Sequence, residues 1–133
     1  MSSFTNRARA SQLVDFDGLQ WGKCRCTDID ISFDWQGKLF GFVEIKTGDA
    51  PLTVGQKIHL TSLVDAIEAG GRKAVAIVAS HSTPLSSDVM ASDCTVRQVY
   101  TGGKWKKFTD SLETLSEYLD SIYVQEPAQR LIK

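Results

Sequence analysis

Residues 28–46 read DIDISFDWQGKLFGFVEIK, and this pattern of apolar and polar side chains predicts a β-hairpin. Before the glycine the two kinds of side chain alternate, which indicates a strand over residues 24–33 with one apolar face. Residues 34–38 predict a turn, and residues 39–46 predict a second strand. Because a short loop that contains glycine joins the two strands, we expect them to pair antiparallel.

The polar side of this predicted hairpin carries acidic and basic side chains. Asp28 and Asp30 lie on the first strand, and Glu44 and Lys46 lie on the second. Two carboxylates that meet across a hairpin repel each other unless a cation neutralises them. Their oxygens suit Mg²⁺ or Mn²⁺, and Mg²⁺ keeps several waters for contact with phosphate. A lysine beside such a cation can orient an attacking water or stabilise developing charge. The pattern therefore predicts a metal site suited to phosphodiester cleavage.

A helix is predicted after the hairpin, because the chain there has both a capping residue and an apolar stripe. Thr53 is a suitable N-cap, and residues 70–71, both glycine, end the pattern. The stripe is formed by Val54, Ile58, Thr61, Val64 and Ile67. The run at residues 74–79 is apolar throughout, which predicts a strand buried on both faces.

The remaining segments complete an alternating order of helices and strands. The pattern predicts a short helix over residues 5–14, strands over residues 93–100 and 104–108, and a helix over residues 111–123. A helix between a hairpin and a buried strand implies a crossover into a mixed sheet. We therefore expect an α/β fold, an α/β/α sandwich with a mixed central sheet, as one domain over residues 1–133.

Composition excludes several classes of protein. The chain has 133 residues, of which 42% are hydrophobic and 23% charged, as in an ordinary globular domain. No apolar run approaches the roughly 20 residues that cross a bilayer, and residues 1–10 lack the apolar stretch of a secretory signal. Its three cysteines predict neither a disulfide framework nor a four-ligand zinc site. We therefore expect a cytoplasmic protein without membrane contact.

Basic side chains gather in local clusters, although the net charge of the chain is −1. Isolated clusters are also typical of a solvated surface. Trp105 stands among lysines, where it can stack on a base or pack against the core as strand aromatics commonly do. The candidate contacts to nucleic acid are Arg7, Arg9, Lys57, Lys104 and Lys106.

Asp30, followed after the turn by Glu44-Ile45-Lys46, resembles the Asp…Glu-X-Lys signature of the PD-(D/E)XK nuclease superfamily. That superfamily includes restriction enzymes, junction resolvases, and phage and repair nucleases. The order of elements over about the first 80 residues is similar to its core, so the resemblance implies a restriction-endonuclease-like fold of phage or prokaryotic type. It also implies that Asp30 and Glu44 hold Mg²⁺ and that Lys46 is catalytic.

The resemblance extends into the helix after the hairpin. Gln56 follows a loop that contains proline, as in a subset of the superfamily whose glutamine faces the active site, which implies a catalytic role. Asp28 and Asp30 are both candidates for the metal ligand, and Asp30 is preferred because it lies nearer the strand interior. Residues 5–14 lack the acid that many members carry there, so the resemblance does not extend to a second metal.

The function expected from these residues is Mg²⁺-dependent endonuclease activity on DNA. A chain of this size has little room for a sequence-reading domain, so we expect structure-directed or weakly sequence-specific cleavage. One alternative is a homodimer similar to a Holliday-junction resolvase, and another is a catalytically silent DNA-binding module of the same fold. A purely structural alternative is an ion-pair ladder across the hairpin.

Overall fold

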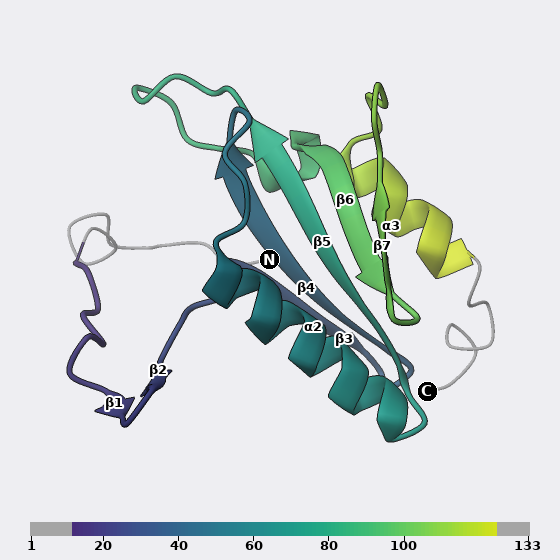
Figure 1. Ribbon diagram of the computed structural model, residues 1–133. Helices are drawn as coiled ribbons and strands as arrows, with labels where there is room; N and C mark the ends of the chain where they lie inside the picture. Colours follow the sequence, from purple (N-terminus) through teal and green to yellow (C-terminus); the bar gives the residue numbers. More distant parts are fainter. Residues whose placement is uncertain (1–11, 125–133) are drawn as a thin grey trace.

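A five-stranded sheet lies at the centre of the computed structural model, which describes residues 12–124 (Figure 1). The strands follow the order β3, β4, β5, β6, β7, with bounds Ile31–Trp35, Leu39–Thr47, Lys73–His81, Thr95–Thr101 and Lys104–Lys107. Neighbours in this sheet pair antiparallel except β4 and β5, which run parallel. The sheet is therefore mixed, as the sequence predicts.

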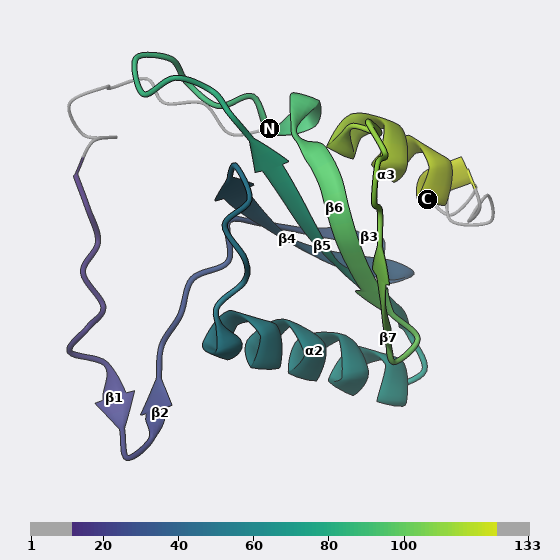
Figure 2. The ribbon, with the colours of Figure 1, turned by 45° about the horizontal axis from the view of Figure 1, so that its top comes forward.

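The two helices cover opposite faces of the sheet, as Figure 2 shows. They are α2, Val54–Ala69, and α3, Leu115–Val124. On one face, Leu60 and Val64 of α2 pack into a cluster with residues of β5 and β6, and on the other Leu115 joins a separate cluster. The α/β prediction is thus confirmed, with the helices as the outer layers. Within residues 12–124, neither helix is long and apolar enough to cross a membrane.

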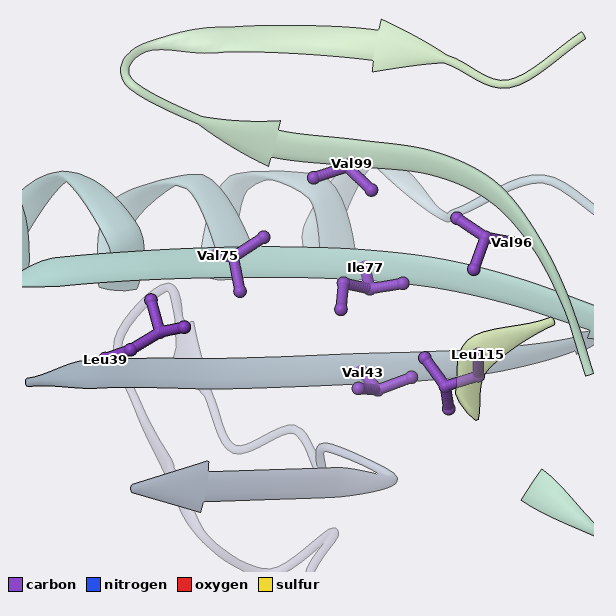
Figure 3. Close-up of a cluster of buried hydrophobic side chains, with 7 residues drawn as sticks. All are labelled: Leu39, Val43, Val75, Ile77, Val96, Val99 and Leu115. Atoms are coloured by element: carbon purple, nitrogen blue, oxygen red, sulfur yellow. The ribbon is translucent and has the colours of Figure 1, made fainter. Parts of the chain in front are cut away.

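The cluster under α3 is aliphatic and spans three strands. Figure 3 shows its members, which are Leu39, Val43, Val75, Ile77, Val96, Val99 and Leu115. Burial of each such side chain contributes about 1.5–3 kcal/mol. Since both faces of β5 are covered, residues 74–80 are all buried. This explains the continuous apolar run in the sequence and confirms the prediction drawn from it.

The bounds of α2 are those predicted, but its buried face is not. Thr53 forms a capping box with Gln56, and the chain leaves the helix through Gly70 and Gly71. The buried side is centred on Leu60 and Val64, whereas Val54 is 77% exposed and Ile58 is 60% exposed. The helix carries two overlapping apolar stripes, and packing against β5 selects the second. The predicted face was therefore wrong in its first turns.

The first predicted strand was wrong in its bounds. Cys24–Arg25 forms β2, which pairs with β1, Gln20–Trp21, in a small ribbon that projects from the main sheet (Figure 1). The hairpin strand β3 instead extends to Trp35, since Asp34 Oδ1 accepts the Gly37 N–H at 2.6 Å and closes a tighter turn. Pairing of β3 with β4 is antiparallel, as predicted.

The helices predicted near the two ends of the chain differ from the prediction where the structure describes them. Of residues 5–14, the structure describes residues 12–14, which form no helix, and the rest lie outside the described residues. The last helix starts later than predicted, because Thr114 caps it by accepting the Glu117 N–H at 3.1 Å. Leu112 therefore precedes the helix and is 87% exposed, although the pattern placed it on the apolar face.

Substitution of Gly41 by alanine is expected to lower the free energy of unfolding by about 1–3 kcal/mol. Gly41 pairs with Phe33 across the hairpin, and a Cβ there would overlap the Phe33 ring. That ring cannot easily move, because it stacks on Trp35 with 4.6 Å between centroids. Urea denaturation measures the effect. Gly55→Ala is the matched control, since a Cβ on this helical residue meets open space. Unchanged stability of Gly41→Ala would contradict this packing.

Candidate active site

Glu44 is a buried acid on β4, with only 4% of its surface exposed. Its Oε2 accepts the backbone N–H of Asp30 at 3.3 Å, and its Oε1 accepts Nε2 of Gln56 at 3.2 Å. A buried carboxylate is costly unless its oxygens have hydrogen-bond donors. These two donors come from the start of β3 and from the first turn of α2, so Glu44 lies where three elements meet.

Asp30 lies beside Glu44, at the point where the hairpin pairing begins. The first paired position is Ile31 with Val43, so residues 30 and 44 lie next along the same ladder. The Asp30 side chain is exposed, and its Oδ2 accepts the N–H of Ile45 at 2.7 Å. This bond anchors the Asp30 carboxylate to β4, next to Glu44. The hairpin thus brings the two acids together, as the sequence predicts.

The pKa of Glu44 is raised from its ordinary value of 4.5, chiefly because burial disfavours its charge. The charge of Asp30 raises this pKa further, and that of Asp28 adds a smaller increase. The hydrogen bond from Asp30 and the charge of Lys46 act in the opposite direction and lower it. The site therefore disfavours the charge of Glu44 relative to a free carboxyl group, and a cation bound beside the acids would oppose this shift.

Gln56 links the acid on β4 to the base on the same strand. Its Oε1 accepts Nζ of Lys46 at 2.7 Å and the N–H of Thr53 at 3.0 Å, which leaves its Nε2 to donate to Glu44. The capping box of α2 therefore fixes the orientation of the amide. The structure thus places Gln56 in contact with Glu44 and Lys46, where the sequence predicts it.

The carboxylates at this site are suited to bind one Mg²⁺ ion between them. Within residues 12–124, no three side chains of His, Cys, Asp or Glu are grouped to hold a metal by themselves. Asp28 lies near, lining a small cleft with Glu44, Gln56 and His59. Mg²⁺ typically binds through one or two carboxylates and completes its shell with water and phosphate oxygens. Asp30 and Glu44 supply that number of carboxylates, and repulsion between them would be relieved by a cation.

Two of the basic residues proposed from the sequence as contacts to nucleic acid, Lys57 and Lys106, lie apart in the structure. Nζ of Lys57 lies 5.7 Å from the centroid of Trp105, which packs against the cluster under α2. Nζ of Lys106 lies 5.3 Å from the centroid of Phe108, which packs against the cluster under α3. Lys57 and Lys106 therefore lie on opposite faces of the sheet. This packing also accounts for Trp105 without a stacked base.

Of the other candidate contacts, the structure describes Lys104. Lys104 precedes Trp105 on β7, so strand alternation directs it to the opposite face from Trp105. Arg7 and Arg9 lie outside the described residues. Among the described candidate contacts, Lys57, Lys104 and Lys106, Lys57 is the one on the α2 face.

Two polar residues near Lys46, Ser80 and Arg97, were missed by the sequence reasoning. Ser80 is the register partner of Lys46 on β5 and is 4% exposed, and its Oγ accepts Nε of Arg97 at 2.7 Å. Lys107 lines the same groove as Lys46 and Arg97. The sequence held one signal for Arg97. The two core valines on either side of it, Val96 and Val99, lie three positions apart, and an unbroken strand would direct them to opposite faces of the sheet.

No protein-family model, no curated protein and no solved structure matches the chain. Function is therefore inferred from the geometry and the charges of this site.

Proposed function

We propose that this protein is a Mg²⁺-dependent nuclease with a restriction-endonuclease-like core, which hydrolyses phosphodiester bonds in DNA. The observation that carries the proposal is the buried Glu44 beside Asp30, with Lys46 linked to Glu44 through Gln56. Acids whose pKa is raised by burial and by a second acid concentrate at functional sites. The charged side chains at this end of the hairpin therefore have a catalytic role rather than a purely structural one.

Asp30 and Glu44 would hold Mg²⁺, with Asp28 near enough to add to the negative potential. When bound, the cation polarises the phosphate and favours deprotonation of the attacking water. The Lys46 ammonium stabilises the negative charge that develops on the phosphate oxygens. Gln56 positions that ammonium by accepting its hydrogen bond at a distance of 2.7 Å. Glu44 has to be ionised for this arrangement, so its raised pKa links activity to pH.

An ion-pair ladder accounts less well for the same residues. In such a ladder each cation bonds directly to a carboxylate on the opposite strand. Here the bond of Lys46 is to the neutral amide of Gln56, and the acids bond to backbone and amide N–H groups. The two carboxylates therefore keep their charge available for a cation.

Cleavage of supercoiled, linear and branched DNA with Mg²⁺ or Mn²⁺, beside an EDTA control, tests the proposal. We expect the metal ions to support cleavage and EDTA to stop it. Preference for branched over linear DNA would identify structure-directed cleavage. Cleavage that continues in EDTA would contradict a metal mechanism, and no cleavage of any substrate by the folded protein would contradict nuclease activity.

A further inference from the structure

A groove of about 420 Å³ opens beside Lys46 and runs across the sheet toward β7. Its lining includes three basic residues, Lys46, Arg97 and Lys107, and two acids, Asp49 and Asp110. The groove thus begins at a residue of the proposed active site and carries a small excess of positive charge. It is suited to a chain of phosphates that needs a few contacts rather than a dense basic surface.

The register of the sheet places these cations on a path that leads away from Glu44. Glu44 pairs with Val78, Val78 with Gln98, and Gln98 with Lys107. Neighbouring strands lie about 4.8 Å apart, so Lys107 stands roughly 14 Å from Glu44 along this row. Arg97 lies next to the same row on β6, roughly 10 Å from β4. The cations are therefore spread over roughly 14 Å across the sheet and are not gathered around one small anion.

A β-bulge directs Arg97 into the groove. In the pairing of β5 with β6, Val78 faces Gln98 and Ala79 faces Val96, which leaves Arg97 unpaired. Val96 and Val99 both lie in the cluster under α3, although they are three positions apart in the sequence. The bulge absorbs the extra residue, so Arg97 and Gln98 both line the groove.

The buried Ser80 holds the Arg97 guanidinium through its Nε–H. Ser80 Oγ accepts the Nε–H at 2.7 Å, and the terminal nitrogens of Arg97 are not used in this bond. Arg97 is exposed. The two remaining NH₂ groups form a planar fork that matches the oxygens of a phosphate.

We infer that Arg97 and Lys107 bind the phosphodiester backbone of a DNA strand on the β6–β7 side of the scissile phosphate. This inference rests on the proposed nuclease function, because it takes the scissile phosphate to lie at Asp30, Glu44 and Lys46. It assigns substrate binding to two residues that lie 10 positions apart in the sequence and on neighbouring strands.

Binding of a short fluorescein-labelled DNA duplex, followed by fluorescence anisotropy in EDTA, tests the inference without cleavage. Arg97→Gln and Lys107→Gln are each expected to weaken binding, roughly tenfold for Arg97. Each substitution should also reduce the slope of log affinity against log salt concentration by about 0.9, the value for one phosphate contact. Arg97→Lys keeps the charge without the fork, so it should retain the slope but recover only part of the affinity.

Lys106→Gln is the matched control, because it removes the same charge from the opposite face. It should leave both affinity and slope unchanged, and thermal melts verify that all variants fold. Cleavage by wild type with unchanged binding by Arg97→Gln and Lys107→Gln would overturn the inference and leave the nuclease standing. Weakened binding by these variants with no cleavage by wild type would overturn the nuclease and keep the groove as a DNA site. Equal weakening by Lys106→Gln would also overturn the inference.

Discussion

Lys46→Ala is expected to lower the rate of DNA cleavage by roughly 10²- to 10³-fold, the usual cost of losing one preorganised charge at a transition state. Mg²⁺ binding should remain nearly intact, because Nζ of Lys46 bonds to Gln56 and not to either acid. Loss of Lys46 also raises the pKa of Glu44, since its charge holds that pKa down. Rates are therefore compared as full pH profiles, so that a lower rate is distinguished from a shift in the pKa of Glu44.

Initial rates on supercoiled DNA and calorimetric titration with Mg²⁺ separate the two effects of this substitution. Asp30→Ala should weaken metal binding and cleavage together, which distinguishes a ligand from a charge-stabilising residue. Lys38→Ala is a control for loss of positive charge on the same hairpin, because Lys38 is exposed at the turn. Full activity of Lys46→Ala would refute the proposed mechanism.

Glu44→Gln is expected to abolish both DNA cleavage and stabilisation of the protein by Mg²⁺. A ligand that binds only the folded state at 100 times its dissociation constant stabilises that state by about 2.7 kcal/mol. Wild type should gain this amount as a rise in Tm with Mg²⁺, whereas the amide that replaces the Glu44 carboxylate has no charge to offer. Equal shifts in the two proteins would mean that Glu44 is not a ligand.

The stabilisation by Mg²⁺ should depend on pH with a defined sign. Without metal, the raised pKa of Glu44 means that the folded state binds this proton more tightly than the unfolded state does. Protonated Glu44 therefore contributes its full stabilisation below pH 4.5, and this contribution is lost as the pH rises through the raised pKa. With Mg²⁺ the carboxylate has to be ionised, so the metal-dependent rise in Tm should grow over that same interval. Melts with Mg²⁺ and with EDTA at each pH measure the difference. A rise in Tm that is independent of pH would contradict ionisation of Glu44 on binding.

Much of the site was predictable from the sequence because local geometry places its residues. A short turn brings Asp30 and Glu44 together by antiparallel register, and strand alternation puts Lys46 on the same side as Glu44. The expectation for Gln56 comes from the resemblance to the nuclease superfamily, and the capping box with Thr53 at the start of α2 fixes its position in the structure. These relations involve neighbours in the sequence or one tight turn.

The sequence by itself determined the hairpin, the bounds of α2, the buried strand β5 and the grouping of Asp30, Glu44 and Lys46, because turns, caps and periodicity act over short stretches of chain. Tertiary structure alone decided which stripe of α2 faces the sheet and how Arg97 reaches Ser80. These outcomes depend on strand order and on one bulge between β5 and β6. Such pairings join residues far apart in the chain, and local periodicity does not encode the partner.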